Sequence, residues 1–253
     1  MLKLGLTSVT FRNLSADDIL DYCRKCNLAA VEWGSDCHVP PGNEEAAAAV
    51  RKKAESAGIC TCSYGSYFRL GTNDDISKYI KSAKALGANI IRIWSAGKSS
   101  ESVMETEYKA LLEETKSVCR AAEKENIQIA FEYHNDTFTD TKNSALRLIK
   151  DASCENLGMY FQYDPQISDR ENEETLKAFL PYLKMVHIFY VDSDYNRFSV
   201  ADGKKIWKSF IKILHDGNAD VYMLFEFLKE SNLSGLKKES EIMQNLLDEV
   251  IKL

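Results

Sequence analysis

The sequence predicts a closed (β/α)8 barrel, the TIM-barrel architecture, from three observations. Short apolar runs alternate with longer segments of helical periodicity along nearly the whole chain of 253 residues. Strands regularly followed by helices imply parallel pairing through right-handed crossovers. Eight strand-helix units can be assigned, which suits a barrel of about 250 residues. The length also predicts a single domain over residues 1–253.

The predicted elements follow one another with short helix-to-strand links. The strands are expected at residues 4–9, 30–33, 59–64, 89–94, 128–133, 157–162, 185–191 and 221–225. The helices are expected at residues 16–25, 44–57, 75–86, 105–125, 142–151, 173–179, 204–215 and 239–251. Ser15 before Asp18 fits a capping box, and Gly58 and Gly87 stand where two of these helices should end.

The same alternation could also build a doubly wound open sheet. However, no glycine-rich G-x-G-x-x-G turn follows the first strand, which removes the usual cofactor signature of that fold. The connections after the strands are mostly long and polar, at residues 34–43, 64–74, 95–104, 134–141, 163–171 and 192–203. In a barrel these loops gather on the carboxyl-terminal face, where barrel enzymes have their active sites.

Composition narrows the classes of function. The net charge of -6 disfavours a nucleic-acid partner, because such a surface repels phosphate polymers. No run of about 18 apolar residues suggests a membrane span, and the amino terminus lacks a signal-peptide pattern. Seven cysteines without disulfide spacing, including an isolated C-x-x-C at Cys23 and Cys26, indicate structural thiols. We therefore expect a cytoplasmic, reduced protein.

Polar residues at the ends of apolar strands point to a metal-dependent active site. Glu132 and Glu226 each end an apolar run, while His187 lies inside another. Carboxylates are costly beside buried strands unless an ion or a reaction requires them. With Gln162, these groups come from predicted strands five to eight, and the alternation of strand side chains aims both glutamates into the barrel mouth.

Each of these residues also has an ordinary structural explanation. A glutamate at a strand end can be a solvated rim residue, and a histidine in a strand can be a hydrogen-bonded core residue. Their joint occurrence at matching positions favours a shared site. Carboxylate and imidazole ligands without thiolates suit one divalent metal ion, namely Mn²⁺, Mg²⁺, Co²⁺ or Zn²⁺.

Several segments give a resemblance to a known family. They are residues 31–34 (VEWG), 37–40 (CHVP), 63–67 (SYGSY), 91–94 (IRIW), 131–134 (FEYH) and 186–188 (VHI). Together they resemble the xylose isomerase-like TIM-barrel superfamily of sugar phosphate isomerases and epimerases. In relatives such as the ketose 3-epimerases, a Glu, an Asp, a His and a second Glu on strands five to eight hold one divalent metal. By position these resemble Glu132, the strand-six site, His187 and Glu226.

Strand six departs from the family pattern. Counted from Gly158, the aspartate position falls on Gln162, whose carbonyl can bind a metal but adds no charge. Asp164 could supply a carboxylate instead if the strand shifts by two residues, which keeps the same face. Pro165 stands where relatives often have a histidine.

Candidate substrate contacts surround the predicted site. They are His38, Trp94, His134 and Arg197. An aromatic ring such as Trp94 can stack on a sugar, and a loop arginine can clamp a phosphate or carboxylate. Rim packing or simple solvation explains such residues as well. Arg92 should point inward and pair with a barrel carboxylate such as Glu32.

The resemblance implies a metal-dependent isomerase or epimerase for a small-molecule sugar or sugar phosphate, with Glu132 and Glu226 as the catalytic acid and base. An inosose-type dehydratase and a non-catalytic sugar-binding barrel are the alternatives. The zinc cluster of endonuclease IV, a relative on the same barrel, needs more histidines than the four present here. Barrels of this kind often pair through exposed helices, so the sequence leaves open whether the chain assembles into a homo-oligomer.

Overall fold

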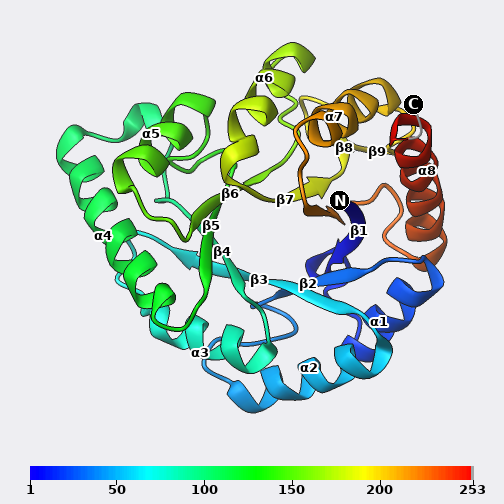
Figure 1. Cartoon of the computed structure of the whole chain (residues 1–253), viewed down its shortest axis with the longest axis horizontal. Coiled ribbons are helices and arrows are strands. Elements are labelled where there is room, and N and C mark those ends of the chain that lie inside the picture. The colour runs from blue at the N-terminus through cyan, green and yellow to red at the C-terminus, as the bar shows by residue number, and fades with distance from the viewer. Residues whose placement is uncertain (252–253) are drawn as a thin grey trace. The chain divides into compact units, whose positions relative to one another are not determined.

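The computed structural model describes residues 1–251, whose helices and strands Figure 1 labels. The barrel strands are β1 Leu2–Thr7, β2 Ala30–Gly34, β3 Cys60–Arg69, β4 Ile90–Trp94, β5 Gln128–Glu132, β6 Leu157–Phe161, β7 Leu183–Ile188 and β10 Val221–Phe225. A separate hairpin consists of β8 Tyr190–Val191 and β9 Arg197–Phe198. The α-helices are α1 Ala16–Lys25, α2 Glu44–Ala57, α3 Ile76–Leu86, α4 Glu105–Glu123, α5 Lys142–Ala152, α6 Asp169–Phe179, α7 Lys204–Asp216 and α8 Leu233–Ile251. Short 3-10 helices are η1 Ser8–Phe11, η2 Ser100–Ser102 and η3 Leu180–Tyr182.

Within the described residues, eight strands close into a barrel in the order β1, β10, β7, β6, β5, β4, β3, β2 (Figure 1). The strand pairs are parallel, as crossover helices require. The predicted (β/α)8 barrel is therefore confirmed, and the open-sheet alternative is wrong. The single domain over residues 1–253 stays a prediction.

The chain divides into two compact units. Unit one consists of Met1–Glu32, Lys53–Cys60 and Phe161–Leu253. It contains β1, β7 and β10 together with α1, α6, α7 and α8, and α7 packs against α8. In this unit Leu6 of β1 is in register with Phe225 of β10 and with Val31 of β2.

Close packing in unit one requires a glycine in β1. A Cβ atom on Gly5 would lie 2.7 Å from Cδ2 of Leu224 and 2.8 Å from the carbonyl oxygen of Ala30. Because real Cβ atoms do not approach other atoms this closely, β1 can lie between β10 and β2 only without a side chain at this position.

Unit two consists of Trp33–Lys52 and Thr61–Tyr160. It holds β4 and β5, β3 from Thr61 onward, the helices α3, α4 and α5, and the part of α2 up to Lys52. Arg92 of β4 is in register with Ala130 of β5. Since strand side chains alternate with a period of two, Arg92 and Trp94 share a face with Ala130 and Glu132. This register places an arginine and a tryptophan beside the glutamate at the end of β5.

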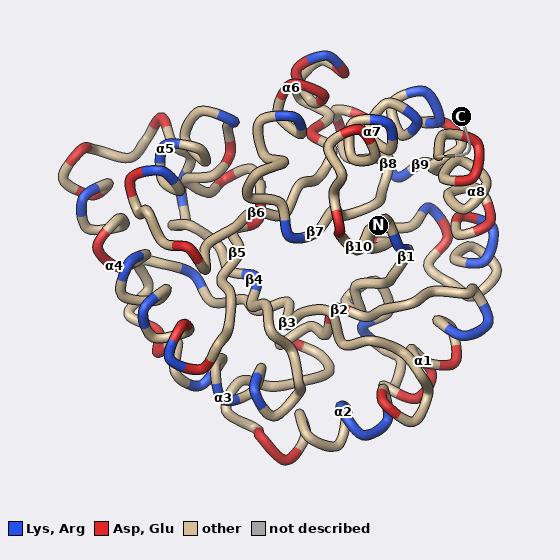
Figure 2. Tube along the Cα trace, viewed as in Figure 1, with Lys and Arg blue, Asp and Glu red and all other residues tan. Residues whose placement is uncertain are grey.

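Figure 2 shows basic and acidic residues mixed along the helices, while the barrel strands are mostly uncharged. The strands carry the buried apolar side chains, and the helices carry solvated charges on their outer faces. None of the helices within residues 1–251 combines the length and the apolar character that a bilayer crossing needs.

Several predicted boundaries are wrong. The first strand ends at Thr7, and Ser8–Phe11 forms a 3-10 helix. Strand β3 continues to Arg69, five residues beyond the predicted end at residue 64, after a register shift between Gly65 and Arg69. The run predicted at residues 185–191 is divided between β7 and the hairpin strand β8.

Two helices begin earlier than predicted because polar residues cap them. Helix α6 begins at Asp169, where Ser168 and Glu171 form a capping box. Helix α8 begins at Leu233, and the Oδ1 atom of Asn232 accepts a hydrogen bond from the Gly235 amide at 2.8 Å. The predicted capping box of Ser15 and Asp18 is present at the start of α1.

Candidate metal and catalytic site

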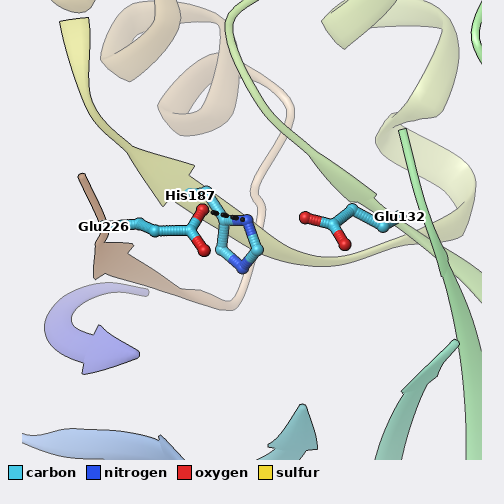
Figure 3. Close-up of side chains that lie close together, drawn as sticks. All are labelled: Glu132, His187 and Glu226. Carbon is cyan, nitrogen blue, oxygen red and sulfur yellow. Dashed lines mark ion pairs between the residues drawn. The ribbon is translucent and has the colours of Figure 1, made fainter. Parts of the chain in front are cut away.

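Three buried side chains from three strands meet at one place. Glu132 ends β5, His187 lies in β7, and Glu226 follows β10. One possible ligand atom from each residue lies within 4.8 Å of the other two. Figure 3 shows the Glu226 carboxylate against the His187 ring, with the ion pair between them marked. The strand periodicity thus brings together the three residues that it singled out.

In unit one, oxygen atoms surround the ring of His187. The Nδ1 atom lies 3.2 Å from Oε2 of Glu226 and 3.2 Å from Oε1 of Gln162. The Nε2 atom lies 3.8 Å from Oε1 of Glu32, which also accepts a hydrogen bond from Thr7 Oγ1 at 3.3 Å. A carboxylate oxygen and an amide oxygen therefore face one ring nitrogen, and a second carboxylate, that of Glu32, faces the other nitrogen. In metal sites a carboxylate on the second nitrogen fixes the orientation of a ligating histidine.

Backbone contacts hold Glu226 in place. Its amide donates a hydrogen bond to the carbonyl oxygen of Ile188 at 3.0 Å, which continues the pairing of β10 with β7 beyond Phe225. The carboxylate is buried, and its Oε2 atom accepts no hydrogen bond of good geometry within residues 1–251. A buried carboxylate oxygen that accepts no hydrogen bond is costly, so this position beside His187 is suited to a cation.

The residues present fit a divalent metal ion. Two carboxylates, an imidazole and an amide oxygen can provide the hard and borderline ligands that Mg²⁺, Mn²⁺, Co²⁺ and Zn²⁺ accept. The thiols of Cys23 and Cys26 lie instead in and just after α1, where both are buried. The candidate ligands are Glu132, His187 and Glu226, with Gln162 beside them.

In unit two, Arg92 and Trp94 both donate hydrogen bonds to Oε2 of Glu132. The Arg92 guanidinium is buried and forms an ion pair with this carboxylate, which stabilises its ionised form. Arg92 was expected to pair with a barrel carboxylate, and in the structure it pairs with Glu132. These donors also fix the direction in which the Glu132 carboxylate points.

The loop that follows Glu132 is tied to the loop after β4. Thr139 Oγ1 donates to the carbonyl oxygen of Glu132 at 2.7 Å. The amide of Thr139 donates to Ser95 Oγ at 3.0 Å, and Phe138 donates to the Ser95 carbonyl at 2.7 Å. Because these groups are buried, the carboxyl end of β5 has little freedom to move.

The two candidates of strand six have different surroundings. Gln162 faces His187, as described above. Asp164 accepts a hydrogen bond from the Gln166 amide at 2.9 Å, as in an Asx turn. Its backbone amide donates to Asn172 Oδ1 at 2.9 Å, and its carbonyl accepts from Asn172 Nδ2 at 2.8 Å. This clamp joins the segment after β6 to α6, and it gives Asp164 a structural role.

Two of the four predicted substrate contacts lie close to Glu132. The rings of Trp94 and His134 are 5.2 Å apart, and Trp94 itself contacts the Glu132 carboxylate. Nδ1 of His134 lies 2.6 Å from the carbonyl oxygen of Asn135. The pair forms an aromatic wall beside the carboxylate, a surface that can pack on the C–H face of a sugar ring.

The other two predicted contacts have different environments. The Nδ1 atom of His38 lies 3.0 Å from Cys37 Sγ, and its ring packs edge-on against Trp33 at 5.9 Å. Arg197 is exposed on the β8–β9 hairpin, with its guanidinium 5.1 Å from the ring centre of Phe227.

Arg69 is a site residue that sequence reasoning missed. Its guanidinium lies 4.2 Å from the ring centre of Trp94 and donates to the carbonyl oxygen of Ala96 at 2.8 Å. Burial lowers the pKa of Arg69 from its usual value, and the carboxylates of Asp136 and Glu132 offset part of this effect. The prediction ended the third strand at residue 64 and so left Arg69 in a loop, whereas β3 extends to it.

The fold and the site together define a (β/α)8 barrel with a buried cluster of acidic and imidazole side chains at its strand ends. The family model of the xylose isomerase-like TIM barrel matches residues 20–246. The chain therefore belongs to the xylose isomerase-like TIM barrel family, which confirms the resemblance found in the sequence. No curated protein sequence matches the chain.

Solved structures share the fold at low sequence identity. The probable 3-DHS dehydratase AsbF from Bacillus anthracis has a TM-score of 0.82 and 17% identity, and the match covers 96% of this chain and 99% of that one. D-Psicose 3-epimerase from Clostridium cellulolyticum, solved with D-tagatose, has a TM-score of 0.78 and 15% identity, with 98% and 99% covered. A xylose isomerase-like TIM barrel protein from Mycobacterium smegmatis, in complex with magnesium, has a TM-score of 0.68 and 15% identity, with 98% and 97% covered.

Proposed function

We propose that this protein is a metal-dependent sugar isomerase or epimerase that removes a proton next to a carbonyl group and acts through an enediolate. The observation that supports this most is the convergence of Glu132, His187 and Glu226 within 4.8 Å. Similar solved structures include a D-psicose 3-epimerase and a family member bound to magnesium. Glu132, Gln162, His187 and Glu226 are the proposed ligands of one divalent ion.

A divalent ion in this position would polarise the carbonyl and neighbouring hydroxyl oxygens of a sugar and so ease proton removal from the carbon. Glu132 and Glu226 are the groups that exchange the proton, one on each side of the substrate. Arg92 and Trp94 orient Glu132 and stabilise its ionised form. Glu32 faces His187 from the other side of its ring and helps to orient that ring.

The substrate contacts follow from the same arrangement. Trp94 and His134 offer an aromatic surface beside Glu132. The Arg69 guanidinium packs on the ring of Trp94. A ring or chain of C–H groups can pack on this surface while its hydroxyl oxygens face the carboxylates. His38 and Arg197 are proposed as contacts farther along the substrate.

A dehydratase acting on an inosose-like polyol is the second candidate function. It is favoured by the structural similarity to the probable 3-DHS dehydratase AsbF, with a TM-score of 0.82. Such a reaction uses the same base and adds an acid for the departing hydroxyl group. A non-catalytic sugar-binding barrel is a third alternative, because Gln162 supplies a neutral ligand at strand six.

A screen in deuterated solvent tests the proposal. Free and phosphorylated ketoses are incubated with the protein and Mn²⁺, Mg²⁺, Co²⁺ or Zn²⁺, and mass spectrometry follows deuterium in the recovered sugar. An isomerase or epimerase incorporates solvent deuterium at carbon, whereas a dehydratase yields a product that is lighter by one water. A protein that binds sugars without either change would be a binding barrel, and the enzyme proposal would be abandoned.

Variants connect the activity to the site. Glu226→Gln should abolish deuterium incorporation, because an amide cannot take up the proton. Glu230→Gln is the matched control, since Glu230 is exposed a few residues farther along the chain. Full incorporation by Glu226→Gln would remove Glu226 from the mechanism. A cytoplasmic location and assembly into a homo-oligomer stay predictions from the sequence.

A further inference from the structure

In unit two, the indole of Trp94 is held by an arginine from the neighbouring strand. The Arg69 guanidinium lies over the indole, 4.2 Å from the ring centre. Its Nη1 atom donates a hydrogen bond to the carbonyl oxygen of Ala96 at 2.8 Å, two residues beyond Trp94. Because the donors of a guanidinium lie in one plane, a group that both stacks on a ring and bonds to the adjacent backbone has little freedom. Arg69 therefore restricts the orientation of the indole.

This contact depends on an irregularity in β3. Gly65 of β3 is in register with Arg92 of β4. An unbroken ladder would therefore pair Tyr67 with Trp94, whereas the register shifts by two residues and pairs Arg69 with it. Tyr67 still meets the indole edge-on, with the ring centres 5.5 Å apart. The irregularity thus places a cation beside the indole, and strand irregularities of this kind are common next to active sites.

The chain after β4 adopts an unusual conformation at the same place. Ala96 has a φ angle of 60°, in the left-handed region that residues with a Cβ atom rarely adopt. Its carbonyl oxygen is the acceptor of the Arg69 hydrogen bond. The amide of Leu70 donates to the Trp94 carbonyl at 3.0 Å and joins β3 to the end of β4. Unfavourable backbone conformations persist where surrounding contacts hold them, and they are concentrated at functional sites.

The same indole contacts the proposed catalytic carboxylate. Nε1 of Trp94 donates a hydrogen bond to Oε2 of Glu132, and this oxygen also accepts from Arg92. Two donors on one oxygen atom fix the direction of the carboxylate and with it the position of the other oxygen. An indole that tilts would lose its hydrogen bond to Glu132. The orientation of Glu132 therefore depends on what holds the indole.

The surroundings of Arg69 suit a supporting role better than the binding of an anion. The side chain is half-buried, and the carboxylates of Asp136 and Glu132 act on it electrostatically. Acidic groups of the protein thus offset its charge. Its planar group is occupied by the Trp94 ring and by the Ala96 carbonyl.

We propose that Arg69 is a positioning residue, which holds the Trp94 indole so that its N–H group stays directed at Glu132. The role of Glu132 as proton acceptor and metal ligand rests on the proposed function. The chain of contacts from Arg69 through Trp94 to Glu132 belongs to the metal-free protein and can be tested there. Arg69 then acts on the reaction through Trp94, without contacting the substrate.

Nuclear magnetic resonance of the metal-free protein tests this chain of contacts. The chain has three tryptophans, so a ¹⁵N-labelled sample gives three indole N–H signals, and Trp94→Phe identifies the signal of Trp94. Arg69→Gln should shift this signal and speed its exchange with solvent about fivefold, the factor expected for a half-buried cation–aromatic contact. Arg69→Lys should have an intermediate effect, because an ammonium group keeps the charge but not the planar stacking. The Trp33 indole, which donates to Thr61 Oγ1 at 3.3 Å, should be unaffected.

Arg147→Gln is the matched control. The Arg147 guanidinium lies 3.7 Å from the ring centre of Tyr108, so this variant removes a cation–aromatic contact elsewhere in unit two. It should leave the Trp94 signal unchanged. A Trp94 signal that is also unchanged in Arg69→Gln and Arg69→Lys would overturn the proposal. Circular dichroism checks the fold of each variant.

Calorimetric titration of Mn²⁺ distinguishes positioning from a direct role of Arg69. Trp94→Phe removes the N–H donor and should weaken Mn²⁺ binding about tenfold or more, as loss of a group that orients a ligand does. Arg69→Gln should weaken it about fivefold. Because Arg69 acts through Trp94, the double variant should bind Mn²⁺ no more weakly than Trp94→Phe alone. If the two losses multiply instead, Arg69 acts independently of Trp94 and the proposal is wrong.

The measurements separate this proposal from the proposed function. If the unmodified protein neither binds Mn²⁺ nor incorporates deuterium, the enzyme proposal fails, while exchange of the Trp94 indole proton still decides whether Arg69 positions the indole. If the protein incorporates deuterium but the Trp94 signal does not respond to Arg69→Gln, the positioning role is rejected and the enzyme proposal stands.

Discussion

Oε1 of Gln162 lies 3.2 Å from Nδ1 of His187, so a neutral amide faces the ring on which the carboxylate of Glu226 also converges. The resemblance to ketose 3-epimerases places an aspartate at this position. The proposed ligand cluster is accordingly less negative than the pattern that the resemblance implies, and this should weaken its affinity for a divalent ion.

Gln162→Asp should tighten Mn²⁺ binding by about tenfold or more, because a carboxylate replaces a neutral ligand. The same change should lower the Tm of the metal-free protein, since a further negative charge would then lie near the Glu226 carboxylate, at the same nitrogen of His187. Calorimetric titration and thermal unfolding with and without Mn²⁺ measure the two effects. Asn245→Asp, the same amide-to-carboxylate change at an exposed position on α8, is the control. Unchanged Mn²⁺ affinity in Gln162→Asp would place residue 162 outside the metal site.

Gly5→Ala should destabilise the barrel. The new Cβ atom would meet Leu224 Cδ2 and the Ala30 carbonyl below 3 Å, and the carbonyl belongs to the backbone and cannot rotate away. Overpacking of this kind costs about 1–3 kcal/mol of unfolding free energy, measurable in urea. Gly97→Ala is the comparison, because its nearest neighbour would be the flexible Arg69 side chain at 3.5 Å. Equal stability of the two variants would contradict the close approach of β1 and β2.

Lys184→Met should raise the stability of the protein at neutral pH. Burial lowers the pKa of Lys184 below its usual value of 10.5, so the folded state binds this proton more weakly than the unfolded state. Between the lowered pKa and 10.5 the unfolded chain holds more protons, and the stability of the unmodified protein should therefore rise with pH in that window. Below the window the cost of the buried charge is fully present.

The effect of Lys184→Met should stay under about 1 kcal/mol, since the side chain is half-buried and water screens its charge. Urea unfolding at pH 7 and pH 10 measures it, with Lys205→Met as a surface control. If Lys184→Met is less stable than the unmodified protein at pH 7, the ammonium group has a stabilising partner and this reasoning fails.

The cysteines should differ sharply in reactivity. Burial, and to a lesser extent the neighbouring Cys26, raises the pKa of Cys23 to about 12. At pH 8 its thiol is therefore protonated as well as inaccessible, whereas Cys60 is exposed. Iodoacetamide should label Cys60 in the native protein and Cys23 only after unfolding, as peptide mass spectrometry would show. Equal labelling rates for the two thiols would show that α1 opens readily.

The sequence could predict the strand-end residues because strand periodicity is strict. Glu132, His187 and Glu226 follow from apolar runs whose alternate residues face the barrel, and nothing beyond the period of two was needed. The partner of Arg92 was harder to assign, because a choice between Glu32 and Glu132 depends on the register of β4 with β5. Such a register is a non-local property that a single sequence does not show.

The arginines outside the strand pattern could not be predicted. Arg69 belongs to β3 only because this strand continues through a register shift. Arg197 was singled out, but its hairpin was read as a loop after one long strand. In each case a local irregularity, and not the regular alternation, positions the charge.

The double hydrogen bond between Asp164 and Asn172 has a consequence for motion at the barrel mouth. Both residues are buried, so the segment after β6 is held to α6 and cannot swing as a lid. The neighbouring hairpin tip at residues 193–196 is exposed, and Gln166 Nε2 connects that rigid segment to it by donating to the Ser193 carbonyl at 2.7 Å. The Gln166 side-chain amide thus attaches the exposed tip of the hairpin to a segment that is itself fixed to α6.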